Sequence, residues 1–175
     1  MNPRVSIVVP FFNEAQNVPL LAARIVAVCA AMEDRHPWEC LFVNDGSTDG
    51  TKEAIDALAA EHAAIRPVHL ARNFGQSAAL IAGMRRAAGE FIITLDGDLQ
   101  NDPGDIPRFL ELLEEYDCVC GYRANRNDTW VRRVSSRVAN RVRNALLRDG
   151  IRDSGCGSKG FRRPWHSSSR WPPRR

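Results

Sequence analysis

Short apolar runs alternate along the chain with longer segments in which apolar residues recur every three or four positions. The short runs are rich in β-branched residues, as in strands, and the longer segments have the helical period. We expect strands over Arg4–Val9, Glu39–Val43, Pro67–Leu70, Glu90–Leu95 and Asp117–Cys120. We expect helices over Val18–Met32, Thr51–His62, Ser77–Ala88 and Asp105–Glu115. This alternation predicts an α/β fold, with a mostly parallel sheet flanked by helices on both faces.

The C-terminal part of the chain has a different pattern. A further helix is expected over Val131–Arg148, with one apolar stripe and an otherwise arginine-rich surface. Residues 161–175 have no period and are rich in Ser, Arg and Pro, which predicts disorder. We therefore divide the chain into a core (residues 1–130), a basic helix with a following loop (residues 131–160) and a tail (residues 161–175). The tail favours a chain truncated or frameshifted at this end.

Composition fits one globular domain, but the charge is unevenly distributed. The 175 residues are 44% hydrophobic and 26% charged, with a net charge of +3. Residues 1–120 carry 9 Lys/Arg against 18 Asp/Glu, whereas residues 121–175 carry 15 against 3. The basic helix therefore predicts an anionic membrane surface as a partner; the alternative is an ordinary helix with a solvated basic face. No nucleic-acid-binding pattern accompanies the arginines, so we expect no nucleic acid partner.

The cysteines and apolar stretches indicate the compartment. Five cysteines have no metal-ligand spacing, and four of them lie in apolar stretches, as in a reduced cytosolic protein. No signal peptide is recognisable, and no run approaches the ~18 apolar residues of a membrane span. We expect a cytoplasmic protein without a transmembrane segment.

Two carboxylates follow a predicted central strand at Asp96 and Asp98. Side chains at i and i+2 share a face of an extended chain, so both acids and Gln100 are expected to converge. Two carboxylates ~5 Å apart repel by roughly 3 kcal/mol at an effective dielectric of 20, and Mg²⁺ or Mn²⁺ would remove that penalty. The alternative is a solvated Asp-Gly-Asp turn.

Polar residues also follow the other predicted strands, at the edge where such sheets bind ligands. Asp45 can accept hydrogen bonds from a ribose or a base, whereas capping of the next helix is enough to explain Asp49. The loop after the first strand lacks a glycine-rich turn and suits a shelf for a flat base; its residues are Pro10, Phe12, Asn13 and Glu14. The helix after the third strand opens with residues suited either to capping or to a phosphate: Arg72, Gly75 and Gln76.

Six segments occur in the order found in family 2 glycosyltransferases of the Rossmann-like GT-A fold. They are VVPFFNE, VNDGSTDGT, RNFGQSAAL, LDGDLQNDP, GYR and DSGCGSK. The chain most resembles the dolichyl-phosphate mannosyltransferase-like branch, which includes bacterial polyprenyl-phosphate glycosyltransferases. The resemblance extends from about Val5 to Gly160.

The resemblance implies metal-dependent, inverting transfer of a sugar from a UDP- or GDP-linked donor to a polyprenyl phosphate, in cell-envelope glycan synthesis. It implies an enzyme that is peripheral at the inner face of the cell membrane. Phe12 stands where a tyrosine is usual. The donor nucleotide would be bound by Pro10, Phe12, Asn13, Glu14, Asp45, Arg72, Gly75 and Gln76. The metal site would be the DXD-type set, Asp96, Asp98 and Gln100. The acceptor phosphate would meet Arg123, Arg132, Arg133 and Ser136, with Asp96, Asp98 and Arg123 as the catalytic residues.

Three alternatives share part of this pattern. Phosphatases with an Asp-x-Asp nucleophile usually carry it after the first strand, and Gln100 stands where they have Thr or Val. NAD-dependent enzymes need the glycine-rich turn that is missing here. The third alternative is a truncated, non-catalytic fragment of such a transferase, which would bind the nucleotide sugar and transfer it poorly or not at all.

Overall fold

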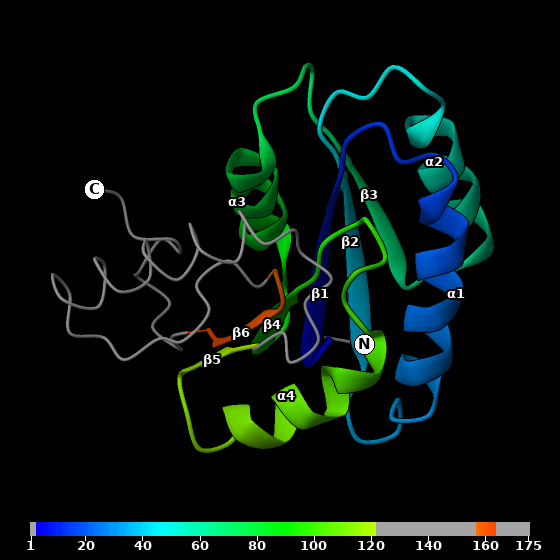
Figure 1. Ribbon diagram of the computed structural model, residues 1–175. Coiled ribbons are helices and arrows are strands. Elements are labelled where there is room, and N and C mark those ends of the chain that lie inside the picture. Colours follow the sequence, from blue (N-terminus) through cyan, green and yellow to red (C-terminus); the bar gives the residue numbers. More distant parts are fainter. Residues whose placement is uncertain (1–2, 122–156, 164–175) are drawn as a thin grey trace, which may run out of the picture.

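A six-stranded sheet of order β3-β2-β1-β4-β6-β5 forms the centre of the molecule in the computed structural model, which describes residues 3–121 and 157–163 (Figure 1). The strands are β1 (Val5–Phe11), β2 (Trp38–Asn44), β3 (Ile65–His69), β4 (Phe91–Thr94), β5 (Cys118–Cys120) and β6 (Lys159–Arg162). The helices are α1 (Asn17–Ala30), α2 (Thr51–Glu61), α3 (Gln76–Arg86), the short 3-10 helix η1 (Pro103–Asp105) and α4 (Ile106–Leu113).

Four neighbouring strands of the sheet are parallel. β1 pairs in parallel with β2 and β4, and β2 pairs in parallel with β3. β6 lies antiparallel between β4 and β5. The predicted α/β fold with a mostly parallel sheet is confirmed, and the carboxyl ends of β1 to β4 meet at one edge.

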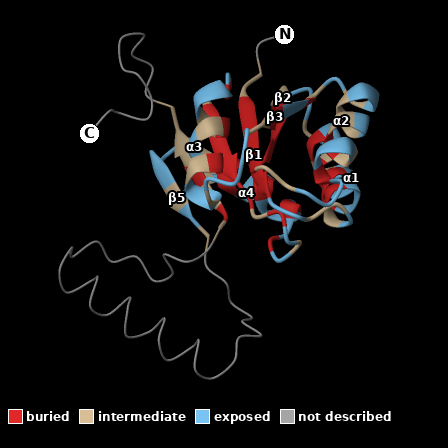
Figure 2. Ribbon diagram, turned by 90° about the horizontal axis from the view of Figure 1, so that it is seen from above, coloured by how far each residue is buried: buried red, intermediate tan, exposed pale blue. Residues whose placement is uncertain are grey.

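Helices cover both faces of the sheet, as expected. α1 and α2 lie on one side and α3 on the other, with buried strands between them (Figures 1 and 2). Alternate residues of β1 divide between the two cores: Ile7 and Val9 share a core with residues of α1, α2 and α4, whereas Val8 packs beneath α3. α3 packs so closely that a Cβ on Gly83 would overlap the Val8 side chain.

A buried carboxylate ties the amino-terminal ends of the strands to the loop after α3. Glu39, which is 4% exposed, accepts hydrogen bonds from Ser6 Oγ and from the Ala88 amide, both at 2.6 Å. The Arg66 guanidinium pairs with the other carboxylate oxygen. Each oxygen is therefore partnered, which a buried carboxylate requires.

Two sequence expectations at the C-terminal end have different outcomes. β6 was not predicted, and it extends to Arg162, so the tail expected to begin at residue 161 starts inside a strand. That boundary is wrong, because pairing with β4 and β5 orders a segment whose composition alone gives no strand signal. The basic helix expected over Val131–Arg148 lies outside the described residues. None of the helices within residues 3–121 and 157–163 has the length and hydrophobicity of a membrane span.

Candidate functional site

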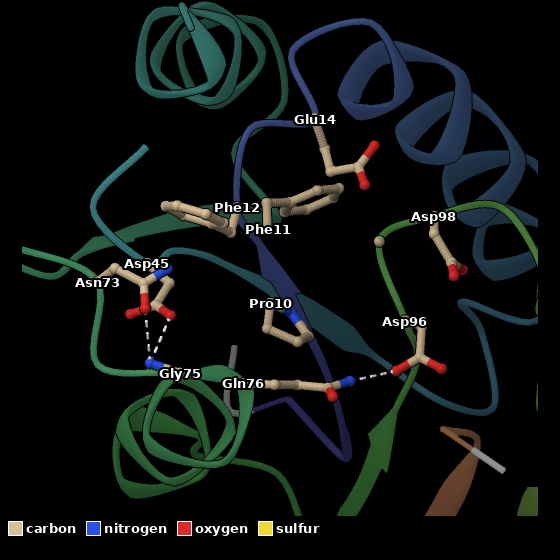
Figure 3. A pocket seen from close by; sticks show the side chains of 11 residues that line it. Pro10, Phe11, Phe12, Glu14, Asp45, Asn73, Gly75, Gln76, Asp96 and Asp98 are labelled. Atoms are coloured by element: carbon tan, nitrogen blue, oxygen red, sulfur yellow. Dashed lines mark hydrogen bonds between the residues drawn. The ribbon is translucent and has the colours of Figure 1, made fainter. Parts of the chain in front are cut away.

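A cleft of about 380 Å³ opens at the edge where the four parallel strands end. Every lining residue comes from the end of one of those strands or from the segment that follows it (Figure 3). These residues are Pro10, Phe11, Phe12, Glu14, Asp45, Asn73, Gly75, Gln76, Asp96, Gly97 and Asp98. The sequence prediction of a ligand site at this edge therefore corresponds to a real concavity, which is where parallel sheets bind ligands.

The loop after β1 supplies one wall of the cleft. Phe11 is buried and packs edge-on against Phe42 with ring centroids 5.0 Å apart, whereas Phe12 is 45% exposed. Asn13 has a positive φ of 56°, and its side chain accepts a hydrogen bond from the Thr48 amide at 2.9 Å. Asn13 is not among the lining residues; in this structure it joins two loops.

The next turn is held by a surface carboxylate. Asp49 accepts hydrogen bonds from the Thr51 amide at 3.1 Å, from Thr51 Oγ1 at 2.5 Å and from the Ala15 amide at 3.2 Å. The bond from the Thr51 hydroxyl is the largest cause that lowers the pKa of Asp49. The N-cap residue of α2 is Gly50, so the expectation that Asp49 caps this helix is not met. Asp49 instead joins the first residue of α2 to the loop after β1.

Asp45 is buried at the floor of the cleft, directly after β2. Its two oxygens accept hydrogen bonds from the amides of Phe74 and Gly75, each at 2.8 Å. The same carboxylate lines the cleft, so it fixes the loop before α3 and also faces the space where a ligand would lie (Figure 3). This internal role was not foreseen, because the partners are backbone amides thirty residues away.

Asp96 and Asp98 both face the cleft, from the turn after β4. The Gln76 amide group donates to Asp96 Oδ1 at 2.7 Å, which links the start of α3 to this turn (Figure 3). Asp98 is exposed, and its Oδ1 accepts a hydrogen bond from the backbone N–H of Gln100 at 3.1 Å. Between them, Gly97 lies so close to β1 that a Cβ would come 2.6 Å from the Phe11 ring. The missing side chain at Gly97 lets the acidic turn sit against the end of β1.

Gln100 does not join the two acids in the cleft lining. Leu99 has a positive φ of 64°, so the chain after Asp98 is not extended. The expectation that all three side chains share one face of an extended segment is therefore wrong at Gln100. Its proposed role as a metal ligand stays a prediction of the resemblance.

The acidic pair suits a hard divalent cation. Both side chains offer carboxylate oxygens to the same open cleft, and Mg²⁺ and Mn²⁺ prefer oxygen ligands. Within the described part of the chain, no group of three or more His, Cys, Asp and Glu residues could hold a metal by itself. Two carboxylates are a common donor set for Mg²⁺, which usually takes its further ligands from water and substrate phosphate.

The remaining predicted residues divide into three groups. Pro10, Glu14, Gly75 and Gln76 line the cleft as expected. Arg72 does not; its guanidinium lies over the ring of the exposed Phe74, 4.7 Å from the ring centroid. The acceptor-side residues Arg123, Arg132, Arg133 and Ser136 lie outside the described residues. Sequence reasoning did not list Phe11, Asn73 and Gly97 in the site, although all three adjoin motif residues it did name.

Comparison with known proteins identifies the family. The family model named Glycosyl transferase family 2 matches residues 6–169. The chain belongs to this family. It is 38% identical to an undecaprenyl-phosphate 4-deoxy-4-formamido-L-arabinose transferase from Serratia proteamaculans, over 91% of this chain and 49% of that protein. It is 44% identical to a dodecaprenyl-phosphate galacturonate synthase from Rhizobium johnstonii, over 90% of this chain and 47% of that one. The chain spans about half the length of the curated relatives it matches.

Solved structures support the same fold. A mannosyltransferase from Pyrobaculum calidifontis, in complex with GDP-Man and Mn²⁺, matches with a TM-score of 0.56 and 27% identity, over 70% of this chain and 36% of that one. Glucosyl-3-phosphoglycerate synthase from Mycobacterium tuberculosis matches with a TM-score of 0.69 and 21% identity, over 91% of this chain and 56% of that one. The GT-A fold that the resemblance implied is confirmed.

Proposed function

We propose that this chain is the donor-binding part of a metal-dependent glycosyltransferase that moves a sugar from a nucleotide diphosphate sugar to a polyprenyl phosphate. One observation carries the proposal: Asp96 and Asp98 face the same strand-end cleft as Asp45 and the loop after β1, in a chain of glycosyl transferase family 2. Relatives named for transfer to undecaprenyl phosphate and synthesis of dodecaprenyl-phosphate galacturonate support this acceptor class. Inversion at the sugar is part of the proposal.

The nucleoside would lie on the Asp45 side of the cleft, beside the loop after β1. Phe12 is an exposed ring beside Pro10, which suits contact with the flat face of a base. The buried Asp45 carboxylate faces the same space and can accept a ribose hydroxyl or a base N–H. We infer that Pro10, Phe12 and Asp45 bind the nucleoside of a UDP- or GDP-linked sugar donor.

The pyrophosphate would lie at the opposite side, beside the acidic pair. Asp96 and Asp98 would hold Mg²⁺ or Mn²⁺, with Gln100 proposed as a further ligand. When bound, such a cation neutralises negative charge that develops on the departing pyrophosphate. Gln76 would hold Asp96 in place, since its amide already donates to that carboxylate. The backbone amides at the start of α3 lie at a helix N-terminus, where anions are favoured.

The acceptor needs little help from a base. A phosphomonoester has a second pKa near 6, so its attacking oxygen is mostly ionised at neutral pH. Residues that orient the acceptor would then matter more than a proton acceptor. We propose Arg123, Arg132, Arg133 and Ser136 for this role, with Arg123 touching the reacting phosphate, on the family resemblance alone.

The location follows from the acceptor. A polyprenyl phosphate resides in a bilayer, so the enzyme must work at a membrane surface. We propose a peripheral position at the inner face of the cell membrane and a role in cell-envelope glycan synthesis. The arginine-rich residues 131–148 would meet the anionic lipid there.

Donor binding can be tested by replacing one acid. We expect Asp98→Asn to abolish Mn²⁺-dependent binding of UDP- and GDP-sugars, because it removes one of two carboxylates from the metal site. The stability of the unliganded protein should stay level or rise slightly, because repulsion between the two acids falls. Isothermal titration with each nucleotide, with and without Mn²⁺, measures the effect, and thermal unfolding checks the fold.

The matched control is Asp102→Asn. Asp102 is also exposed and also closes a turn, accepting the Gly104 amide at 2.9 Å, but it does not line the cleft. This variant should bind the donor like the parent protein. Equal Mn²⁺-dependent affinity for the parent and Asp98→Asn would contradict the metal assignment. Transfer itself is tested with radiolabelled nucleotide sugar and undecaprenyl phosphate, and an absence of both donor binding and transfer would overturn the proposed function.

A further inference from the structure

β6 brings a distant part of the chain back to the acidic turn. Residues 157 and 158 directly precede β6, which pairs with β4 in the register Thr94↔Lys159. Thr94 is the last residue of β4 and is buried, and its hydroxyl donates to the Gly157 carbonyl at 2.9 Å. The start of this returning segment is therefore attached to the strand that ends two residues before Asp96.

Gly157 packs directly on the Asp96 carboxylate. A Cβ on Gly157 would overlap all three atoms of that carboxyl group, with Oδ2 the nearest. On the other oxygen, Oδ1, the Gln76 amide donates its hydrogen bond. The carboxylate is thus confined between a side chain from the start of α3 and the backbone of the segment before β6.

Further contacts hold the returning segment in place. The Asn101 side-chain amide donates to Ser158 Oγ at 2.5 Å, in a buried position. At the other end of β6, Arg162 lies 3.5 Å from a carboxylate oxygen of Glu114, and its guanidinium lies 5.5 Å from the Phe91 ring centroid. Anchors at both ends leave Gly157 little freedom to withdraw from Asp96.

We propose that Gly157, held by the Thr94 hydroxyl, is a positioning residue that sets the orientation of the Asp96 carboxylate for the divalent cation. The inference rests on the proposed function, because it assigns Asp96 to a metal site. Position 157 requires glycine because of its close contact with Asp96, not because of its backbone conformation. Any side chain at this position would displace the Asp96 carboxylate. Groups that orient metal ligands typically change metal affinity about 10- to 100-fold when they are mutated.

The first test is Gly157→Ala. We expect Mn²⁺ affinity to fall at least about 10-fold. Titration of the full chain with Mn²⁺, followed by electron paramagnetic resonance with and without UDP, measures this affinity independently of catalysis. The matched control is Gly160→Ala in the same returning segment, where a Cβ would meet Leu113 at 2.9 Å and Phe109 at 3.0 Å, away from the acids. Gly160→Ala should lower thermal stability and leave Mn²⁺ affinity unchanged.

A second pair of variants tests the anchor and does not depend on Gly157→Ala folding. Thr94→Val keeps the volume of the side chain but loses the hydroxyl, so Mn²⁺ affinity should fall. Thr94→Ser keeps the hydroxyl and should retain the affinity. Thermal unfolding of both variants shows whether the loss of Mn²⁺ affinity exceeds what the loss of stability explains.

The outcomes are distinguishable. If the parent protein binds Mn²⁺ neither alone nor with UDP, the proposed function fails, and this inference fails with it. If the parent binds Mn²⁺ but Gly157→Ala binds equally well, only the positioning inference is overturned. An equal loss in Gly157→Ala and Gly160→Ala, or in both Thr94 variants, would also overturn it, because the effect would then follow stability.

Discussion

A carboxylate at the surface can be as firmly held as one in the core, and Asp49 is such a case. Three hydrogen bonds converge on it, two from Thr51 and one from Ala15, so it joins the loop after β1 to the start of α2. The Thr51 hydroxyl is the main cause of its lowered pKa. The ionised form is therefore favoured more in the folded state than in the unfolded state.

This pKa shift predicts a pH-dependent effect of Asp49→Asn. A group whose pKa is lower when folded adds stability above its unfolded pKa, and that contribution disappears as the pH falls through the folded value. We expect Asp49→Asn to lower the free energy of unfolding at neutral pH, with the difference closing below pH 3.8, the ordinary pKa of the group. Urea unfolding across this range measures it.

The control for this experiment is Asp105→Asn. Asp105 is exposed, and its side chain makes no hydrogen bond within the described part of the chain. At neutral pH its free energy of unfolding should stay within about 0.5 kcal/mol of that of the parent. A pH-independent loss in Asp49→Asn would mean that its charge contributes nothing to the fold.

Among the elements, the loop between α3 and β4 is held in part by a buried acid, Glu39. Glu39→Ala would leave the Ala88 backbone N–H, the Ser6 hydroxyl and the Arg66 guanidinium without the carboxylate that accepts from them. Breaking such a buried cluster destabilises by about 3 kcal/mol. Chemical denaturation measures the change in unfolding free energy. We expect this loss of stability to leave the cleft residues in place, because the Glu39 cluster lies at the amino-terminal ends of the strands and the cleft lies at their carboxyl ends.

Glu111→Ala is the matched control for Glu39→Ala. Glu111 pairs with Arg108 at 2.6 Å, but both side chains are more than 60% exposed. Exposed pairs of this kind contribute about 0.5 kcal/mol or less. A loss at Glu39 as small as the loss at Glu111 would show that burial of the cluster does not matter for stability.

Elements with a strong local period were predictable, and elements defined by pairing were not. β1 to β4 and the four α-helices lie within a few residues of their expected bounds, because apolar periodicity reports which side of an element is buried. β6, with the sequence KGFR, has no such period and exists through its pairing with β4 and β5. The same reason hides Gly157: nothing local indicates that it meets Asp96.

At the candidate site, the residue types were predictable and their partners were not. Acids after strands at positions 45, 96 and 98 follow from sequence order and the topology of parallel sheets. That Asp45 holds two amides of the next loop, and that Leu99 turns the chain away before Gln100, depends on backbone geometry. Local sequence carries no signal for either.

Over the whole molecule, charge is separated along the chain. Residues 1–120 have a net charge of −9, and residues 121–175 have a net charge of +12. We expect the protein to co-sediment with anionic phosphatidylglycerol vesicles, because basic residues near such a surface contribute roughly 1 kcal/mol each. Binding should fall as salt is added, since screening weakens the attraction.

Neutral phosphatidylcholine vesicles are the control for this experiment. Replacing Arg132, Arg133 and Arg137 together by Gln should reduce binding to the anionic vesicles without affecting Mn²⁺-dependent donor binding. Equal co-sedimentation with neutral and anionic vesicles would contradict an electrostatic membrane contact.

Two consecutive residues, Gly75 and Gln76, contact both sides of the cleft where the loop joins α3. Gly75 donates to Asp45 through its amide, and the next residue, Gln76, donates to Asp96 through its side chain. The nucleoside proposed to contact Asp45 and the cation proposed to contact Asp96 would therefore both depend on this segment. Thermodynamic linkage requires that coupling be reciprocal: whatever factor the nucleoside adds to cation affinity, the cation returns to nucleoside affinity. If both bind as proposed, a change in this segment that alters their coupling would change the two affinities by the same factor.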